Sequence, residues 1–429
     1  MKVVVASVPI VGHVNSMLSI SKILKQNGHQ VLAYTASTYG QRFKALGADF
    51  SAFPRAIDYD LTDSDGMLPD RRLLAPGIDR LLFDWEHVLI DPMMEQYAGL
   101  LRLLDDFPAD IILCDNLFMG TLPMLLGKNS SRPAIVHCGI TCLSHHRDDG
   151  APFGLGLPPA STEKELREYE FLHAKMSADF FHPVQDYLNE ELINLGLGPL
   201  TMPLLDANVT LPDLFLQPTV PEFEYPRRTS PGSLRFIGAM PLPPVIAPEP
   251  LWLDNAIRDR RSTILVTQGT GANQDLSQLV EPALAALADR DDIQVLVTTG
   301  GRPLSAISGS VPANARIASY LPFDKLMSRA DLLITNGGYG SVNYALSHGV
   351  PVVAAGTGED KAEVGTRVTW SGTGTNLTID HPSSGSLRQA IDKVFESKSH
   401  REKTELFAQS FARYDVQTAM PDLLERLVS

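Results

Sequence analysis

His13 is the first residue of the chain whose type and position could do chemistry. It lies in the stretch ASVPIVGHVNSML, Ala6–Leu18, between a run of small apolar residues and the expected start of a helix. Imidazole titrates near neutral pH, so a histidine at this point could be a working base. It could also be a polar residue at the end of a buried strand, and the stretch alone leaves both interpretations open.

Two glycine-rich turns in the second half of the chain could bind an anion. They are QGTGANQ, Gln268–Gln274, and TNGGYGS, Thr335–Ser341. Glycine lets the backbone approach a ligand closely, and a helix after the turn offers free N–H groups and a positive dipole end. One such turn is weak evidence, because any tight strand-to-helix turn needs glycine. Two in the same half, with the Thr270 hydroxyl, favour a phosphate site that suits a diphosphate.

Cysteine and histidine gather in HCGITCLSHH, His137–His146, which raises the question of a metal site. The spacing matches no ordinary zinc pattern, so we favour a strand end and a loop that line a pocket, and we predict no metal. The three cysteines, Cys114, Cys138 and Cys142, cannot form a disulfide framework, and a reducing interior is the simplest setting for them.

The elements that must position these residues alternate between strands and helices. Val3–Ala6 is continuous, β-branched and apolar, which predicts a short buried strand, and apolar residues recur at helical spacing after His13. Such alternation predicts right-handed crossovers and a parallel sheet. Further strands of the first half are expected in HQVLAYTA (His29–Ala36), in the end of FKALGADFSAF (Phe43–Phe53), in DIILCD (Asp110–Asp115) and in RPAIVHCG (Arg132–Gly139).

The composition changes in the middle of the chain, where prolines gather, and the alternation then restarts. PLPPVIAPEP, Pro241–Pro250, indicates an extended linker. Strands of the second half are expected in STILVTQGT, IQVLVTTGG, ARIASYLPFDKLMSRA, DLLITNGGYGSVNYALSHG and VPVVAAG. We therefore expect an N-terminal domain over residues 1–215, a proline-rich linker over 216–255, a second domain over 256–405 and C-terminal helices over 406–429.

Open parallel sheets bind ligands beyond the carboxyl ends of their strands. His13, Asp115, Thr270, Asn336 and Gly356 all fall at such ends. The pattern therefore predicts a ligand site in a cleft between two α/β domains.

Composition excludes several classes of partner. The 429 residues include 36 basic and 50 acidic side chains, a net charge of −14 that disfavours nucleic acid. The chain has no run of 18 apolar residues, so we expect no membrane span. The apolar run after Met1 is too short for a signal peptide, so we expect a cytoplasmic protein.

Two stretches carry a resemblance to a known family. They are GHVNSMLSISKIL, Gly12–Leu24, and LLITNGGYGSVNYALSHGVPVVAAGTGEDKAEVGTRV, Leu332–Val368. The chain resembles the family 1 glycosyltransferases of the GT-B fold, which move sugars from nucleotide diphosphates onto small lipophilic acceptors. The resemblance covers nearly the whole chain. It implies two Rossmann-like α/β domains whose parallel sheets face each other across a cleft, with the last helix returning to the N-domain.

The resemblance implies roles for His13 and Asp115. His13 stands where the family has a general base towards the acceptor hydroxyl, and Asp115 where an aspartate orients that histidine. A carboxylate behind an imidazole fixes its tautomer and stabilises the imidazolium. The resemblance also implies an inverting displacement without a metal, in which a helix dipole and backbone donors neutralise the leaving group.

The resemblance places the donor nucleotide sugar in the second half of the chain. Thr270 corresponds to a phosphate-binding hydroxyl, and Gly338, Gly340 and Ser341 to the phosphate turn. Gly12, which gives the turn before His13 room, is also expected to bind the donor. Tyr320 is expected to stack on uracil and the Leu321 backbone to hydrogen-bond it. Asp360, with Glu359 beside it, matches the acid that grips the sugar hydroxyls.

Three positions depart from the family pattern. Asn336 stands where a histidine usually contacts phosphate, and it can still donate a hydrogen bond but cannot become cationic. Tyr344 stands where a glutamate usually binds the ribose. Lys361 stands where glutamine usually follows the aspartate, and it either contacts the sugar or pairs with Glu359. These departures leave the donor open: UDP-glucose is the default, and another UDP sugar or a dTDP sugar is an alternative.

The acceptor site is less defined. In this family it is built from N-domain loops, which here include Pro69–Met94 and Cys142–Pro159. Apolar residues at helical spacing are as often core as pocket. The candidates for acceptor contact are Phe83, Trp85, Met93, His137, Phe153 and Leu155. A phenol, flavonoid, macrolide or sterol would suit such a pocket.

We therefore expect an inverting hexosyltransferase that uses no cofactor and no metal. Its co-substrate is a nucleotide sugar, its partner a small lipophilic acceptor, and the protein is a monomer or weak homodimer. Two alternatives stay open: a catalytically silent family member that binds nucleotide sugars or a partner protein, and a different GT-B enzyme such as an epimerase.

Overall fold

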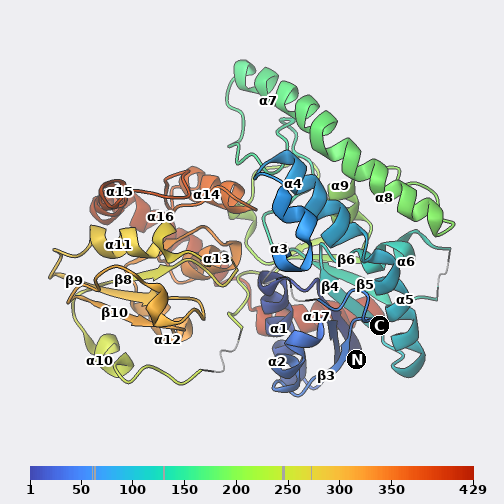
Figure 1. Cartoon of the computed structure of the whole chain (residues 1–429), viewed down its shortest axis with the longest axis horizontal. Coiled ribbons are helices and arrows are strands. Elements are labelled where there is room, and N and C mark those ends of the chain that lie inside the picture. The colour runs from blue at the N-terminus through green and yellow to red at the C-terminus, as the bar shows by residue number, and fades with distance from the viewer. Residues whose placement is uncertain (60, 62–63, 129–130, 244–246, 272) are drawn as a thin grey trace.

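The computed structural model describes residues 1–429 except 60, 62–63, 129–130, 244–246 and 272. The described chain forms two lobes, each built around one parallel sheet with helices on its faces (Figure 1). The two lobes correspond to the two Rossmann-like halves expected from the sequence, and the α/β, GT-B fold class is confirmed.

The first lobe contains a seven-stranded sheet in the order β3-β2-β1-β4-β5-β6-β7. Every neighbouring pair is parallel. The order reverses direction between β1 and β4, the position at which doubly wound sheets bind their ligands. Its strands are β1 (Lys2–Ala6), β2 (Gln30–Thr35), β3 (Asp49–Ala52), β4 (Ile111–Asp115), β5 (Ala134–Cys138), β6 (Leu214–Gln217) and β7 (Leu234–Phe236).

The second lobe repeats this plan with a six-stranded parallel sheet in the order β10-β9-β8-β11-β12-β13. Here the order reverses between β8 and β11, so the two lobes have equivalent binding edges. Its strands are β8 (Ser262–Thr267), β9 (Ile293–Thr298), β10 (Ala315–Ala318), β11 (Leu332–Thr335), β12 (Val352–Ala354) and β13 (Gly374–Asn376).

Both faces of the second sheet are buried, which explains its continuous apolar runs. Leu265 and Leu333 pack into one hydrophobic cluster, while Ile264 and Ile334 pack into another on the opposite face. Alternate side chains of one strand therefore supply two cores.

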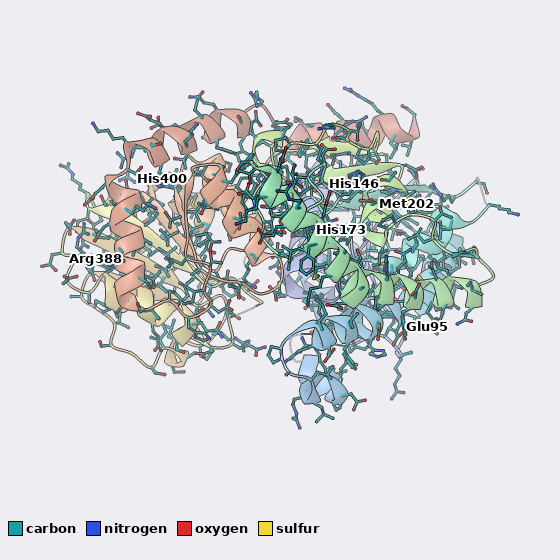
Figure 2. All side chains as sticks on the ribbon, turned by 90° about the horizontal axis from the view of Figure 1, so that it is seen from above. Glu95, His146, His173, Met202, Arg388 and His400 are labelled. Carbon is teal, nitrogen blue, oxygen red and sulfur yellow. The ribbon has the colours of Figure 1, made fainter. Side chains whose placement is uncertain are left out.

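Helices cover both sheets. In the first lobe, α7 and α8 run end to end as one long rod (Figure 1). Figure 2 shows His173 on this rod and Arg388 on the second lobe. The helices of this lobe are α1 (Val11–Gln26), α2 (Gly40–Lys44), α3 (Ser64–Met67), α4 (Ile78–Phe83), α5 (Met93–Asp106), α6 (Leu122–Leu126), α7 (Glu163–Met176), α8 (His182–Asn194) and α9 (Leu204–Thr210), with π-helical segments at Asp84–Ile90 and Ser177–Phe181. Those that follow are α10 (Leu253–Arg258), α11 (Val280–Ala286), α12 (Phe323–Leu326), α13 (Tyr339–Ser347), α14 (Lys361–Trp370), α15 (Ser384–Glu396), α16 (Lys398–Phe411) and α17 (Val416–Val428). Within the described chain, no helix is both long and apolar enough for a bilayer span.

The two C-terminal helices go to different lobes. Phe407 and Phe411 of α16 pack into the core of the second lobe. Met420 and Leu424 of α17 are fully buried in the core of the first lobe. The chain therefore crosses back to its first lobe between α16 and α17, several residues after the expected boundary at 406.

The segment expected as a linker contains part of the first sheet. β6 ends inside the range 216–255, and β7 adds to its edge with Phe215 paired to Leu234. Only one of the three residues of β7 is buried, so the strand lacks the continuous apolar run that marks a buried strand. Residues 244–246, inside the proline-rich run, lie outside the described residues.

Candidate active site

His13 and Asp115 form a buried pair. Nδ1 of His13 lies 2.8 Å from Oδ1 of Asp115, and the two side chains are 9% and 0% exposed. His13 lies in the first turn of α1, directly after β1, and Asp115 is the last residue of β4. Because β1 and β4 are neighbours at the point where strand order reverses, the fold itself brings together two residues 102 positions apart.

The hydrogen bonds around Asp115 select one tautomer of His13. Oδ2 of Asp115 accepts the N–H of Val8 at 2.9 Å, and Oδ1 accepts the N–H of Leu117 at 3.0 Å. A carboxylate held among N–H donors is an acceptor, so Nδ1 of His13 carries the proton and donates it. Nε2 is left with a free lone pair, the state that a general base requires.

The first glycine turn of the second lobe meets α1 of the first. Nδ2 of Asn15 donates to Oγ1 of Thr270 at 3.3 Å, and Nη2 of Arg42 donates to Oδ1 of Asn15 at 2.7 Å. Gly12 is exposed one residue before His13, with open space where a side chain would stand. The structure therefore brings Thr270 to the His13 end of α1, and Asn15 and Arg42 are contacts that the sequence had not indicated.

The second glycine turn leads into α13. Gly338 precedes the helix, Gly340 is exposed with open space around it, and Oγ of Ser341 donates to the Gly338 carbonyl at 2.9 Å. The first N–H groups of a helix lack intrahelical partners and carry its positive dipole end. This end can therefore accept an anion.

Asn336 has a structural contact within this site. Its Nδ2 donates to the Gln268 carbonyl at 2.7 Å, and the residue is 8% exposed. The bond ties the turn after β11 to the turn after β8, so Asn336 fixes the spacing of the two glycine turns.

Tyr320 and Leu321 follow β10 at the same edge of the sheet. Tyr320 is 38% exposed, whereas Leu321 is 6% exposed and packs in the core. A side chain on Gly301, whose φ is +95°, would meet the Tyr320 hydroxyl at 2.3 Å. Glycine at 301 thus leaves room for the hydroxyl end of the partly exposed Tyr320 side chain.

The acidic segment before α14 combines an exposed and a buried acid. Nζ of Lys361 pairs with Glu359, and the two side chains are 9% and 70% exposed. Burial raises the pKa of Asp360, and the Thr141 hydroxyl of the first lobe and Lys361 partly oppose that rise. Of the two expectations for Lys361, the pairing with Glu359 is the one present.

Tyr344 lies on α13, and its ring packs against the His348 ring, with 4.6 Å between the two ring centroids. Burial, with a smaller contribution from Asp324, raises the pKa of its phenol, which stays neutral. A neutral phenol can donate to or accept from a ribose hydroxyl, but it does not supply the charge of a carboxylate.

The six acceptor candidates do not form one group. Met93 is fully buried in a hydrophobic cluster of the first lobe, and Trp85 packs edge-to-face on Phe180 at 5.9 Å. Phe83 is half-buried beside His87, with 4.4 Å between ring centroids. Met93 and Trp85 therefore pack with a hydrophobic cluster of the first lobe, whereas the ring contact of Phe83 is with His87.

His137 is also a core residue. Its Nε2 lies 3.0 Å from Oγ1 of Thr121, its Nδ1 lies 3.0 Å from the Asn208 carbonyl, and it is 4% exposed. Burial lowers its pKa to about 4. Both ring nitrogens are occupied by the protein, so the structure places His137 in a structural position and not in one facing an acceptor.

Phe153 and Leu155 belong to a loop that contacts the second lobe. Phe153 packs against its core, and Leu155 is 38% exposed. The N–H groups of Gly154 and Gly156 both donate to Oε1 of Glu363 on α14, at 2.9 and 3.0 Å. The loop is thereby joined to the helix that starts after Asp360.

Glu363 is part of a buried ionic cluster that the sequence did not reveal. Arg367 of α14 donates to Glu363 at 2.7 Å and pairs with Glu224 at 2.9 Å, and all three side chains are 1–2% exposed. The Arg367 guanidinium also lies 4.0 Å from the Tyr225 ring centroid. Because Glu224 lies between β6 and β7 of the first sheet and Arg367 belongs to the second lobe, the cluster joins the two lobes.

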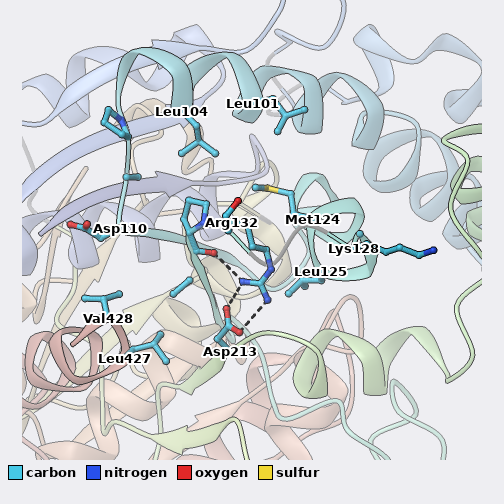
Figure 3. A pocket seen from close by; sticks show the side chains of 16 residues that line it. Leu101, Leu104, Asp110, Met124, Leu125, Lys128, Arg132, Asp213, Leu427 and Val428 are labelled. Carbon is cyan, nitrogen blue, oxygen red and sulfur yellow. Dashed lines mark hydrogen bonds and ion pairs between the residues drawn. The ribbon is translucent and has the colours of Figure 1, made fainter.

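A large depression lies at the other end of the first sheet, away from His13. It measures about 960 Å³ and is lined at the amino ends of β4, β5 and β6, around the Arg132–Asp213 ion pair (Figure 3). Leu427 and Val428 of α17 form one wall. The chemistry-bearing residues lie at the carboxyl ends of the strands, so this depression is separate from the candidate site.

Comparison with known proteins gives the family. Residues 281–423 match the family model described as erythromycin biosynthesis protein CIII-like, C-terminal domain. UDP-glycosyltransferase 2 of Phaeomoniella chlamydospora is 32% identical over 437 residues, covering 100% of this chain and 96% of the relative. The 4'-demethylrebeccamycin synthase of Lentzea aerocolonigenes is 33% identical over 431 residues, covering 100% and 99%.

Solved structures agree with this fold. The glycosyltransferase of kitacinnamycin has a TM-score of 0.73 at 17% identity, covering 100% of this chain and 99% of its own. The calicheamicin glycosyltransferase CalG4 has a TM-score of 0.72 at 18% identity, covering 100% and 98%. Two relatives above 30% identity align end to end with a chain that has the GT-B fold and a buried His13–Asp115 pair. The chain therefore belongs to the family 1 natural-product glycosyltransferases.

Proposed function

We propose that the protein transfers a sugar, with inversion, from a nucleoside diphosphate sugar to a hydroxyl of a small lipophilic acceptor. The observation that carries the proposal is the buried His13–Asp115 pair at the reversal point of the first sheet. Thr270, at the equivalent point of the second sheet, contacts Asn15 of the same helix as His13. A base and a diphosphate site are thereby held side by side.

The proposed step is a single displacement. The acceptor hydroxyl oxygen attacks the anomeric carbon and gives its proton to Nε2 of His13, while the bond between that carbon and the diphosphate oxygen breaks. The imidazolium is stabilised by Asp115. One attack from the side opposite the leaving group inverts the anomeric carbon, and no covalent intermediate forms.

Backbone donors are proposed to stabilise the leaving diphosphate. The Thr270 hydroxyl and the first N–H groups of α13, near Gly340, can donate to its oxygens. We infer that transfer requires no metal, because this helix end supplies donors and a positive dipole where negative charge develops.

UDP-glucose is the proposed donor. Relatives named UDP-glucosyltransferase include one from Starmerella bombicola, 28% identical over 434 residues. The partly exposed Tyr320 ring is proposed to stack on the base, and Asp360 and Glu359 are proposed to hold the sugar hydroxyls. The fold neighbour VinC is described in complex with dTDP, so a dTDP sugar is the alternative donor.

The proposed acceptor is a polycyclic or macrocyclic natural product. The relatives' names mention rebeccamycin, and the fold neighbours' names mention calicheamicin and kitacinnamycin. In this chain the exposed Leu155 and the half-buried Phe153, on the loop joined to α14, offer apolar contact beside the donor segment.

The test is a matrix of nucleotide sugars and acceptors with product detection by mass spectrometry. UDP-glucose, other UDP sugars and dTDP sugars are each paired with phenolic, indolocarbazole and macrolide acceptors. We expect a mass increase of one hexose with at least one pair, and an anomeric coupling opposite to that of the donor by NMR. UDP binding by calorimetry without transfer or donor hydrolysis in any pair would favour the catalytically silent alternative.

A further inference from the structure

A second group of titratable side chains lies outside the site described above. His145 and His146 belong to the loop after β5, and Asp206 lies in the first turn of α9. One ligand atom from each residue lies within 4.8 Å of the other two. His146 is labelled on the first lobe in Figure 2. The two histidines belong to the run HCGITCLSHH, but the carboxylate comes from 60 positions further along the chain.

We propose that His145, His146 and Asp206 bind a divalent transition-metal ion, of which Zn²⁺ is the expected one. Two imidazoles and one carboxylate form the kind of ligand set that leaves a fourth position open on zinc. Imidazole ligands favour zinc, nickel, cobalt and copper over magnesium and calcium, which prefer an all-oxygen set.

The spacing of the ligand atoms suits this ion. Nδ1 of His146 lies 3.0 Å from Oδ2 of Asp206. In a tetrahedral site with bonds of about 2.0–2.1 Å, neighbouring ligand atoms lie roughly 3.4 Å apart. The two imidazole rings are neighbours, with centroids 4.2 Å apart and planes tilted by 35°. The side chain of His146 is 57% exposed and leaves a path for the ion.

His145 supplies an independent sign of a missing ligand. The residue is 8% exposed, and within the described part of the chain its buried Nδ1 has no hydrogen-bond partner. An unsatisfied buried polar atom costs roughly 1–3 kcal/mol. An ion coordinated by Nδ1 of His145 in the plane of its ring would give this nitrogen the partner that the protein itself does not provide.

The surrounding contacts hold the site in shape. The His146 N–H donates to Oδ1 of Asp206 at 2.8 Å, which ties the loop to α9. Arg227 donates through Nη2 to the His145 carbonyl at 3.0 Å and through Nε to the His146 carbonyl at 3.2 Å. Such outer contacts orient metal ligands, but the guanidinium also adds a nearby positive charge. The expected affinity is therefore micromolar, weaker than that of a closed four-ligand site.

An ion at this position would link the acceptor loop to the first lobe. The same loop continues to Gly154 and Gly156, which donate to Glu363 of the second lobe. Metal binding would thus order the loop between its contact with α9 and its contact with Glu363. The ion would play no part in the sugar-transfer step.

The test uses the untagged full-length protein after treatment with a chelator. Calorimetric titration with Zn²⁺ should show one saturable site per chain, and Co²⁺ should give the visible absorption of a tetrahedral site. His146→Ala and Asp206→Asn should each weaken Zn²⁺ binding by at least about tenfold. His173→Ala, which removes an exposed histidine of α7, should leave it unchanged.

Several results would overturn the proposal. These are the lack of a saturable Zn²⁺ site in the unaltered chain, or full Zn²⁺ affinity in His146→Ala. Because that side chain is mostly exposed, His146→Ala should fold normally, which its thermal unfolding in chelator would check. His146→Ala therefore decides the question even if Asp206→Asn, which also loses loop contacts, is unstable.

Discussion

At the scale of single residues, two buried histidines of the first lobe, His13 and His137, differ in how many of their ring nitrogens the protein contacts. His13 has one nitrogen committed to Asp115, which leaves the other free for chemistry. His137 has both nitrogens committed, to Thr121 and to Asn208. The number of protein partners, and not burial, distinguishes the proposed base His13 from the core residue His137.

Asp115→Asn is expected to lower kcat by about a hundredfold to ten thousandfold with little change in UDP affinity. Asparagine has one acceptor oxygen and one NH2 group; if the oxygen accepts the Val8 N–H, the NH2 group faces Nδ1 of His13 and favours the tautomer protonated on Nε2. Steady-state kinetics and UDP calorimetry measure the two effects. Asp110→Asn at the opposite end of β4, where the carboxylate accepts the Lys2 N–H, is the matched control. Equal kcat in the two variants would contradict the orienting role of Asp115.

His137 makes the stability of the fold depend on pH. Its pKa is lowered by burial to about 4, below the ordinary value of 6.5 that it has when unfolded. The unfolded chain therefore binds the proton first as the pH falls, and stability is lost from about pH 6.5 down to pH 4. Between pH 7 and pH 5 the loss from this residue is about 2 kcal/mol.

Urea unfolding at pH 7 and pH 5 tests this dependence. The variant His137→Gln should lose less stability than the unaltered chain over the same interval, even if it is less stable at both. His173→Gln on exposed α7 should behave like the unaltered chain. A His137→Gln variant with an unchanged pH slope would show that other groups carry the acid sensitivity.

At the scale of elements, α14 joins the donor segment to the acceptor loop. It begins after Asp360 and carries Glu363 and Arg367, which contact the loop and Glu224. Three charged side chains, Arg367, Glu224 and Glu363, are almost fully buried together. Water cannot stabilise their charges there, so each charge is stabilised by its oppositely charged neighbour.

Arg367→Met is expected to lower the free energy of unfolding by about 3–5 kcal/mol, because it leaves Glu224 and Glu363 buried and unpaired. Urea unfolding gives the value. Arg388→Met, which removes two partly exposed ion pairs of α15, with Asp289 and Asp392, is the control and should cost no more than about 1 kcal/mol. Similar losses in the two variants would show that the buried cluster adds no stability.

The sequence was sufficient for the main elements and for the residues at strand ends. Long apolar runs and glycine turns identified β1, β4, β8, β11 and α13. It was not sufficient for β7 and β13, which have three residues each. The sequence also did not reveal the hydrogen bond between Asn15 and Thr270 or the ion pair between Arg367 and Glu224. The partners in each contact are more than 140 positions apart, and such contacts leave no local sequence pattern.

At the scale of the whole molecule, α17 makes the last residues of the chain part of the first lobe. Val416, Met420 and Leu424 pack into the core built on β1 and α1. The chain therefore passes between the lobes before β8 and again before α17. Relative motion of the lobes must be accommodated at both crossings.

Leu424→Ala should lower the free energy of unfolding by about 2–5 kcal/mol, because the side chain is fully buried. Leu406→Ala on α16, where the leucine is 54% exposed, should change it by less than about 0.5 kcal/mol. Urea unfolding compares the two. If Leu424→Ala costs no more than Leu406→Ala, the docking of α17 in the first lobe is contradicted.

The central claim is that His13 is the base of a glycosyl transfer whose donor is held by the other lobe. The most direct test measures both kcat and UDP affinity of His13→Ala. The kinetics use the donor and acceptor that the substrate matrix identifies, and His173→Ala is the control. The account predicts that kcat falls by about a hundredfold to ten thousandfold while the UDP dissociation constant stays within about twofold. Full turnover by His13→Ala would contradict it.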